Sequence, residues 1–375
     1  MKTTPSQKKL EIVILDFDDI KNPLLNAGQA RSTYEVGSRL VKKGHKITVI
    51  TSKFPNSFDR IEASIIYKHI GLGSRFIRLN NLFYIFVLSR TVRNLRADII
   101  IECFTPPFST LFSPLFSKIP VVALPTMFKA NEFAKKYHLP FHWIEKFGMR
   151  FYKYFLPFSE VDCLKAKKLN PKLIYKIIPQ GVDREFFSIP RAKPKHLLYF
   201  GRMDISQKGI DILLESFATV ADKIKYPLLL AGHGPDESRV RSLIAKFKLE
   251  KDVKMIGQIR GETKAKIFSQ ALFNVFPSRH DEICLGTLEV LAAGIPIVCF
   301  DIPESSWISG KVALKAKPYD KNEFGLLILK ACIPDLSNIM GQQARKFAQK
   351  YTWESVTDAY EAFCQKVVGL ERNYD

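Results

Sequence analysis

Two cationic side chains stand in a glycine-bounded loop near the middle of the chain. Arg202 follows Gly201, and Lys208 precedes Gly209, directly after the apolar run 195–200. A loop at the carboxyl end of a buried strand tends to face a ligand in open α/β sheets. Either side chain alone would be an ordinary surface charge. The pair, with a glycine at each end, favours a site that neutralises a diphosphate.

Three acidic side chains form a second candidate group. Asp281 and Glu282 precede Gly286, and Glu289 follows it in an apolar stretch that ends at Gly294. We expect a helix to begin near Gly286 and to point its free N–H groups at a ligand. Glu289 could then accept hydrogen bonds from both hydroxyls of a ribose, and Asp281 from a sugar. Acidic residues are also favoured near helix amino termini for electrostatic reasons alone, and the spacing does not separate the two interpretations.

Further candidates lie in glycine turns. Gly257 follows the apolar run 253–256, where a nucleobase could meet backbone groups. Gly28 closes the loop after the first strand, which also tends to face a ligand, although a tight turn explains this glycine equally well. A metal site would need a carboxylate cluster, and the nearest one is the acidic run 16–19. We favour a structural role for that run, so we expect neither a metal nor a cofactor.

The elements around these residues alternate between strands and helices. In the second half we expect strands at about 195–200, 227–231, 253–256, 272–276 and 296–300. Between them we expect helices at about 209–222, 236–247, 263–270 and 286–293. The alternation predicts an α/β fold class of two doubly wound, Rossmann-like parallel sheets that face a cleft, with ligands at the carboxyl ends of the strands.

The first half is less regular. Residues 10–15, 32–43 and 46–51 predict a right-handed strand–helix–strand unit. We expect a strand over 61–69, a helix over 82–96, and a helix over 141–154 whose aromatic residues belong to the core. Proline and lysine cluster at 191–194, and we place the domain boundary there, between residues 190 and 191.

Bulk properties bound the class of protein. A chain of 375 residues favours two domains. We expect no secretory signal, because residues 1–9 are polar and basic, and the apolar runs 82–88 and 108–116 are shorter than the roughly 20 residues that span a bilayer. Six scattered cysteines without a Cys-x-x-Cys pair fit reduced thiols. These features predict a cytoplasmic location.

The formal net charge of +20 is the strongest global feature. Such a field attracts anionic partners. The window 129–176 holds eleven Lys or Arg and four Asp or Glu, interleaved with aromatic residues. This window fits either a solvated basic face over an aromatic core or peripheral attachment to an anionic membrane surface on its inner side. Nucleic acid ranks behind both, because no recognised binding motif appears, and we expect no nucleic-acid partner.

The second half resembles the retaining glycosyltransferases of family 4, which have the GT-B fold. The motifs that carry this resemblance stand in family order: 178–183, Gly201-Arg202 with Lys208-Gly209, 230–235, Gly257, and 277–278 through 294–296. Residues 351–354 resemble the start of the closing helix, which in this family crosses back onto the first domain. In the first half, Gly28 and 39–49 resemble the glycine loop and the first helix and strand. The resemblance implies an acceptor-side domain at 1–190, a nucleotide-sugar domain at 191–350, and the crossing helix at 351–375.

The resemblance also implies roles. The enzyme would move a hexosyl group from a UDP- or GDP-sugar to a glycan or lipid-linked acceptor, with retention and without a metal. Arg202, Lys208 and Asp281 would carry the transfer, with Asp281 on the donor sugar. Glu289 would hold the ribose and Gly28 would let the first domain approach the phosphate. The remaining donor-binding positions would be Gly201, Gly257, Glu282, Ile283, Cys284 and Leu285.

Three departures from the family pattern keep different functions open. Asp281 is one methylene shorter than the usual glutamate, Ala27 replaces one of two paired glycines, and Thr126 stands where the family often has a histidine. A catalytically degenerate nucleotide-sugar-binding protein would fit these changes. A GT-B epimerase of nucleotide sugars is a second possibility. A membrane- or nucleic-acid-binding module, which would use the positive charge by itself, is a third.

Overall fold

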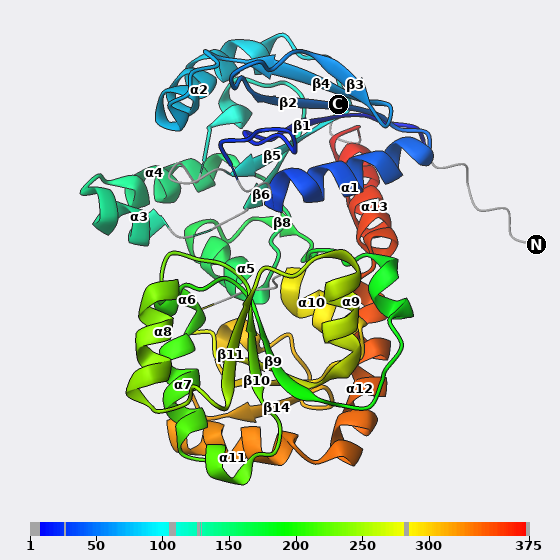
Figure 1. Cartoon of the computed structure of the whole chain (residues 1–375). Helices are drawn as coiled ribbons and strands as arrows, with labels where there is room; N and C mark the ends of the chain where they lie inside the picture. Colours follow the sequence, from blue (N-terminus) through cyan, green and yellow to red (C-terminus); the bar gives the residue numbers. More distant parts are fainter. Residues whose placement is uncertain are drawn as a thin grey trace, which may run out of the picture. The chain divides into compact units, whose positions relative to one another are not determined.

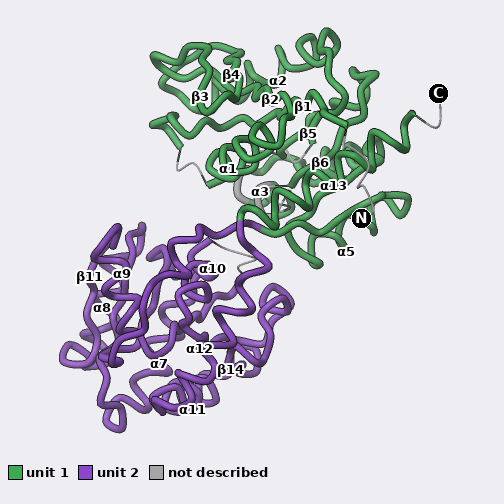
Figure 2. The backbone as a smooth tube through the Cα atoms, turned by 90° about the vertical axis from the view of Figure 1, so that its right-hand side faces the viewer, with its two compact units in different colours: residues 1–179, 353–375 green, residues 180–352 purple. Residues whose placement is uncertain are grey.

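The computed structural model describes residues 8–25, 28–104, 110–125, 128, 130–280 and 285–372. Within it the chain forms two compact units, which Figure 2 shows in different colours. Unit 1 comprises Met1–Pro179 and Trp353–Asp375, and unit 2 comprises Gln180–Thr352. The units therefore part eleven residues before the expected boundary at 190/191, and the division of the chain into domains at 190 and 350 stays a prediction.

Unit 1 is built on an eight-stranded sheet in the order β3-β4-β2-β1-β5-β6-β7-β8 (Figure 1). All neighbours pair in parallel except β3 and β4. The strands are β1 (Glu11–Leu15), β2 (Lys46–Ser52), β3 (Arg60–Glu62), β4 (Ile65–Ile70), β5 (Ile99–Phe104), β6 (Val121–Pro125), β7 (Tyr154–Phe155) and β8 (Ile174–Tyr175). The single strand expected over 61–69 is wrong: Ala63 and Ser64 both have positive φ, as a tight hairpin turn requires, and they split it into two antiparallel strands.

The helices of unit 1 are α1 (Gly28–Lys42), α2 (Ile77–Arg93), α3 (Ala130–Tyr137), α4 (Phe141–Gly148), α5 (Glu160–Leu169) and α13 (Trp353–Arg372). Two short 3₁₀ turns, η1 (Ser113–Leu115) and η2 (Met149–Phe151), join them. The chain returns to unit 1 through α13, which packs on α1. The buried Glu361 carboxylate of α13 accepts a hydrogen bond from Lys43 and lies 2.9 Å from the Nε2 of His45.

The helix expected over 141–154 ends earlier, at Gly148. The η2 turn follows, and Tyr154 lies in β7, where it is buried. The interpretation of the aromatic residues as core is wrong for two of them, because Trp143 is 61% exposed and Phe147 is 54% exposed. The helix buries the side that carries Phe141, Glu145 and Gly148, and the rings of Trp143 and Phe147, four residues apart, lie on its other side in solvent.

Unit 2 contains a six-stranded, wholly parallel sheet in the order β11-β10-β9-β12-β13-β14. Its strands are β9 (His196–Phe200), β10 (Leu228–Ala231), β11 (Val253–Gly257), β12 (Ala271–Phe276), β13 (Ile297–Phe300) and β14 (Ala313–Ala316). Its helices are α6 (Ile205–Lys208), α7 (Ile210–Ala218), α8 (Glu237–Lys246), α9 (Gly261–Gln270), α10 (Leu285–Ala292), α11 (Lys321–Ala331) and α12 (Pro334–Ala348). The predicted alternation and fold class are confirmed.

Both faces of the unit 2 sheet are buried, which explains why its strands are continuously apolar in sequence. Leu197 and Tyr199 pack into the apolar cluster on one face, and Leu198 packs into the cluster on the other. Side chains of successive strand residues point to opposite faces, so β9 supplies both layers. Within the described residues, no single helix is long and apolar enough to cross a bilayer, while one sharply bent pair, α11 with α12, passes that test by length and composition only.

Candidate functional site

The loop after β9 contains the two predicted cations. Gly201 follows the strand, and the single-turn helix α6 ends at Lys208. Asp204 caps α6 by accepting a hydrogen bond from the Gln207 backbone at 3.1 Å. Gly209, at φ +66°, then turns the chain into α7. The loop therefore consists of a capping residue, one helical turn and a glycine in the left-handed conformation. This short, hydrogen-bonded structure holds Arg202 and Lys208 at the end of the strand.

The loops after β10 and β11 pack directly on this first loop. Gly232, at φ +144°, approaches the Gly201 carbonyl so closely that a side chain there would overlap it. Gly232 also donates its N–H to the Gly257 carbonyl at 2.8 Å, and Gly201 donates to the Ala231 carbonyl at 3.0 Å. Gly257 has φ +68°, and a methyl group on it would meet no atom within 4 Å. Three backbone turns thus lie together, with open space beside the last.

The loop after β12 is tied to α6 from the other side. The Pro277 carbonyl oxygen fills the space that a side chain on Gly209 would need. Ser278 donates its hydroxyl to the Gln207 carbonyl at 3.1 Å, and Arg279 donates its N–H to the same carbonyl at 2.9 Å. These contacts bring the start of the segment that holds the predicted acidic residues to the Lys208 loop.

The two cations differ in environment. The Arg202 side chain is 56% exposed and donates to Asp204 at 2.7 Å and to Gln207 at 2.9 Å. The Lys208 ammonium group is half-buried and lies 6.0 Å from the centroid of the Phe276 ring. Burial opposes ionisation of Asp204, but hydrogen bonds from Ser206 and Gln207 and the two cations outweigh it, so the pKa of Asp204 stays below its usual value. An anion at this loop would compete with Asp204 for the same charges.

Glu289 has a partner that the sequence analysis missed. Glu289 lies on α10, which begins at Leu285, one residue before the expected start. The Lys264 ammonium group, on α9, donates to the Glu289 carboxylate at 2.5 Å, and both side chains are largely buried. The same ammonium group lies 4.6 Å from the Phe186 ring and 5.0 Å from the Phe200 ring. No sequence signal joins positions 264 and 289, because only the parallel sheet brings α9 beside α10.

The described candidates of unit 2 share one edge of the sheet, the edge at which its parallel strands end. They are Gly201, Arg202, Lys208, Gly257, Leu285 and Glu289. Figure 1 draws α6, α9 and α10 at one end of unit 2 and α11 at the other. Asp281, Glu282, Ile283 and Cys284 lie outside the described residues, as does Thr126. Their roles, and those of the described candidates, stay predictions.

The carboxyl edge of the unit 1 sheet is acidic. Gly28 opens α1 there, and a methyl group on it would meet no atom within 4 Å. Burial raises the pKa of Asp16 to about 6, although it accepts a hydrogen bond from Thr33 at 2.5 Å. Burial and the Asp16 charge raise the pKa of Asp18 to about 7.

Asp19 is occupied by structural contacts. Its carboxylate accepts hydrogen bonds from Arg60 at 2.7 and 2.8 Å and lies 3.0 Å from the Nε2 of the buried His69. Burial opposes ionisation of Asp19, but these contacts hold its pKa well below the usual range. Among the described residues, no group of three or more His, Cys, Asp or Glu could hold a metal ion.

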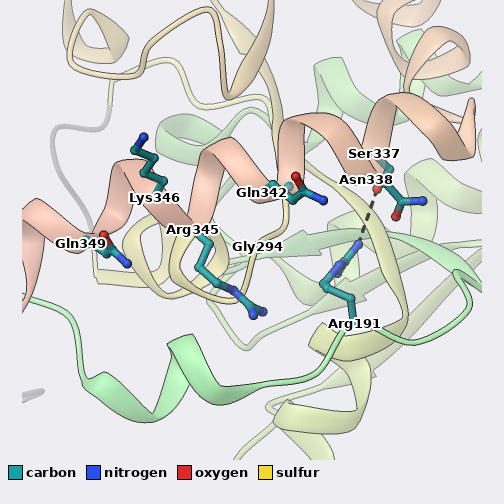
Figure 3. A pocket seen from close by; sticks show the side chains of 9 residues that line it. Arg191, Gly294, Ser337, Asn338, Gln342, Arg345, Lys346 and Gln349 are labelled. Atoms are coloured by element: carbon teal, nitrogen blue, oxygen red, sulfur yellow. Dashed lines mark hydrogen bonds between the residues drawn. The ribbon is translucent and has the colours of Figure 1, made fainter.

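A cavity of about 620 Å³ lies at the opposite, amino-terminal edge of the unit 2 sheet (Figure 3). Arg191 donates there to the carbonyls of Phe268 and Ala271, and Arg345 donates to those of Ile189 and Ala293. Burial and the Arg345 charge lower the pKa of Arg191 to about 10. We interpret both arginines as structural. Their guanidinium groups donate hydrogen bonds to the carbonyls at the carboxyl ends of α9 and α10 and so stabilise these helix ends.

Two family models match most of the chain. The model described as Glycosyltransferase Family 4 matches residues 26–186, and the one described as Glycosyl transferases group 1 matches residues 194–332. The O-antigen chain mannosyltransferase B of Escherichia coli is 25% identical over 166 residues, which are 43% of this chain and 43% of that protein. The GDP-mannose:cellobiosyl-diphosphopolyprenol alpha-mannosyltransferase of Xanthomonas campestris is 29% identical over 144 residues, covering 37% of this chain and 38% of that protein. The matches span less than half the length of these two relatives.

Solved structures match over nearly the whole length. Sucrose-phosphate synthase from Thermosynechococcus elongatus superposes with a TM-score of 0.75 at 17% identity, covering 96% of this chain and 100% of that one. HepE from Anabaena, in complex with UDP, superposes with a TM-score of 0.68 at 13% identity, covering 95% and 100%. At these identities the likeness shows the fold.

Proposed function

The chain belongs to glycosyltransferase family 4 and has the GT-B fold, and from this premise we propose that it moves a hexosyl group from a nucleotide-diphosphate sugar to a glycan or lipid-linked acceptor. One observation carries the proposal: Arg202, Lys208 and the Lys264–Glu289 pair belong to one edge of the unit 2 sheet. This edge offers cations for a diphosphate and, within the same set of loops, a carboxylate for a ribose.

In the proposed reaction the protein acts mainly by placing charged side chains next to the leaving diphosphate. As the bond from the sugar to the donor phosphate breaks, negative charge grows on the leaving diphosphate. Preplaced cations at Arg202 and Lys208, with the amino terminus of α10, stabilise that charge where it develops. Glu289 accepts hydrogen bonds from the ribose and Asp281 from the donor sugar. The proposal also includes retention of the anomeric configuration and independence from a metal, because glycosyltransferase family 4 implies both.

The proposal leaves two donor bases open, uracil and guanine. The Xanthomonas relative is named for GDP-mannose, and the Anabaena structure contains UDP. In the proposal, Gly257 provides the turn at which the base meets backbone groups, since its surroundings are open. A backbone contact of this kind recognises a base through its hydrogen-bonding edge, so the two bases can be told apart by binding alone.

The acceptor is proposed to be a glycan or a sugar carried on a lipid. Two relatives are named for an O-antigen chain and for a diphosphopolyprenol-linked sugar. The acidic edge of unit 1 supports a hydroxyl-bearing acceptor, because the partly exposed carboxyl group of Asp18 can exchange hydrogen bonds with sugar hydroxyls, while the buried Asp16 beside it is held by Thr33. A lipid-linked acceptor would bring the protein to an anionic membrane surface, which we propose as its peripheral location.

A ligand screen followed by a transfer assay tests this function. We expect thermal stabilisation by either UDP or GDP and by the matching nucleotide sugars, with EDTA causing no loss. Transfer to oligosaccharide or polyprenyl acceptors, with the anomeric configuration of the product read by NMR, then tests retention. Stabilisation without hydrolysis or transfer would instead favour a degenerate binding protein, and a changed sugar in the absence of acceptor would favour an epimerase.

A further inference from the structure

The outward face of α2 is a feature of unit 1 that sugar transfer leaves unexplained. One side of this helix is buried at every fourth residue, at Asn80, Tyr84, Leu88 and Val92. The other side exposes large apolar side chains, namely Phe76, Leu79, Leu82, Phe83, Phe86 and Val87. Phe76 and Phe86 are 71% and 70% exposed. A contiguous exposed apolar patch of this kind marks a docking surface in proteins that are otherwise polar outside.

Positive charge borders the apolar face of α2. Arg75 and Arg78 stand at its start, Arg90 and Arg93 stand at its end, and all four are exposed. The segment 63–97 contains no Asp or Glu. A helix with an apolar outer face and arginines at its margins matches a surface that is apolar within and anionic at its boundary, which is the interface of an anionic bilayer.

The apolar surface continues from α2 toward α4. The guanidinium group of Arg93 lies 5.9 Å from the centroid of the Phe116 ring, next to the η1 turn. At the other end of that turn, the Phe112 ring lies 6.3 Å from the ring of Phe147 on α4. Leu115, between them, is 53% exposed. The segment 112–116 therefore joins the two helices, through the Arg93 guanidinium group at one end and a ring–ring contact at the other.

The outer side of α4 has the same character. Trp143 and Phe147 are exposed, and the Lys146 ammonium group lies 5.4 Å from the centroid of a Trp143 ring. Glu145 is the one acidic residue of this helix, and it is buried. Tryptophan beside lysine suits the boundary between headgroups and acyl chains, because the indole ring is apolar with a polar edge.

We propose that the apolar face of α2, continued by the outer side of α4, docks unit 1 onto an anionic lipid bilayer. The aromatic and aliphatic side chains enter the boundary between headgroups and acyl chains, and the arginines pair with lipid phosphates. The helix lies in the plane of the surface. The inference rests on the proposed function, because a lipid-linked acceptor brings the protein to a membrane, but its test uses binding alone.

Vesicle flotation measures the docking directly. The full chain is mixed with vesicles of phosphatidylcholine alone or of phosphatidylcholine with phosphatidylglycerol, at low and high salt. We expect binding to the anionic vesicles at low salt and weak binding to the neutral ones. The double variant Phe76→Ser/Phe86→Ser should lower the affinity by at least about tenfold. The matched control is Phe58→Ser/Ile61→Ser, whose side chains are 70% and 73% exposed elsewhere on unit 1, and it should bind as the unmodified protein does.

A second pair of variants separates this surface from the overall charge of +20. Arg75→Gln/Arg90→Gln should weaken binding by about 30-fold, since two basic residues near an anionic surface contribute on the order of 1 kcal/mol each. Arg239→Gln/Arg241→Gln, on the exposed side of α8, makes the same change in net charge and should have little effect. Circular dichroism and the unfolding temperature are measured for every variant to show that folding is intact.

Three results would overturn the docking surface. One is failure of the full chain to float with anionic vesicles. Another is a loss in Arg239→Gln/Arg241→Gln equal to that in Arg75→Gln/Arg90→Gln, which would mean that net charge alone drives binding. The third is a dimer, seen by light scattering, that Phe76→Ser/Phe86→Ser dissolves while vesicle binding is absent, because a second copy would then cover α2. A protein that floats as expected yet transfers no sugar would contradict the proposed function and leave this inference standing.

Discussion

The carboxyl edges of the two parallel sheets carry opposite charge. In unit 2 the edge presents Arg202, Lys208 and Lys264, the last paired with Glu289. In unit 1 it presents the partly exposed Asp18, with Asp16 buried beneath it. Both edges arise from the same strand–helix alternation, so the fold supplies two equivalent places for a ligand and the loop residues decide which ligand each can take. Cations suit a diphosphate, and carboxylates suit hydroxyl groups.

The two edges are also held differently. In unit 2, glycines let neighbouring loops touch through their backbones, as at Gly209 against Pro277 and Gly232 against Gly201. In unit 1, hydrogen bonds between side chains hold the loop in place, as from Thr33 to Asp16. A loop held by backbone contacts keeps its geometry when a ligand displaces side chains, whereas a buried carboxylate changes its protonation with its surroundings. The difference predicts sensitivity to backbone substitution in unit 2 and to pH in unit 1.

The largest effect is expected from the cationic edge. Lys208→Ala removes a charge from the proposed diphosphate site, and transfer should fall by about 100-fold or more, as for loss of one preplaced donor in an oxyanion site. Arg202→Ala should act in the same direction. Steady-state kinetics with circular dichroism as the folding check measures this, and Lys254→Ala, an exposed lysine on β11, is the control. Normal turnover in folded Lys208→Ala would remove the lysine from the reaction.

Next in size is the backbone packing of unit 2. Gly209→Ala needs a left-handed alanine and pushes a methyl group into the Pro277 carbonyl. We expect unfolding free energy to drop by roughly 2–4 kcal/mol, from strain and overpacking together. Gly261→Ala has a similar positive φ but open space around it, so it should cost only about 1–2 kcal/mol. Urea denaturation of both variants compares them, and equal losses would show that the loop contact contributes nothing.

The Lys264–Glu289 pair should have a smaller, binding-specific effect. Lys264→Met keeps the apolar stem among the aromatic rings and removes the charge that holds the Glu289 carboxylate. The Kd for the nucleoside diphosphate chosen by the screen should rise about tenfold, which corresponds to about 1.4 kcal/mol. A double-mutant cycle with Glu289→Gln, read by calorimetry, tests the coupling. Additive effects of the two changes would mean that the pair does not act as a unit.

The smallest effect concerns the acidic edge of unit 1. Because Asp18 has a raised pKa of about 7, the folded state binds more protons than the unfolded state between about pH 4 and pH 7, and stability falls as pH rises through that window. Asp18→Asn removes this cost, so we expect Tm to rise by about 2–4 °C at pH 8, with little change below pH 4. Calorimetry across pH checks it. A variant with the same pH dependence as the unmodified protein would show that Asp18 is not the group responsible.

Much of the fold could be read from local patterns. The strands of unit 2 are short apolar runs between glycine turns, and the structure contains β9 to β13 within a residue or two of the expected positions. Where local signals conflict, the sequence misled. The run 61–69 is apolar enough for one strand, but two residues at positive φ break it. The aromatic spacing of 141–154 suggested one buried helix, but that helix ends at Gly148.

The candidate site was predictable where it depends on position after a strand. Gly201, Arg202 and Lys208 follow β9, so their shared loop follows from the alternation alone. Lys264 was missed because its role depends on the side-by-side placement of α9 and α10 and on aromatic rings from separate segments. The exposed face of α2 was missed for a related reason: a helix with apolar residues on two opposite sides does not reveal which side the sheet covers.

Sequence alone determined the alternation of strands and helices, the family, the excess of positive charge, and the glycines and cations that follow particular strands, since each of these depends on neighbours along the chain. Tertiary structure decided which charges meet, as at Lys264 and Glu289, which carboxylates lose contact with water, as at Asp16, and which apolar side chains stay outside, as at Phe76 and Phe86. The physical reason is that pairing, desolvation and exposure depend on distances between segments remote in the chain, and only the packing of helices against the sheets sets those distances.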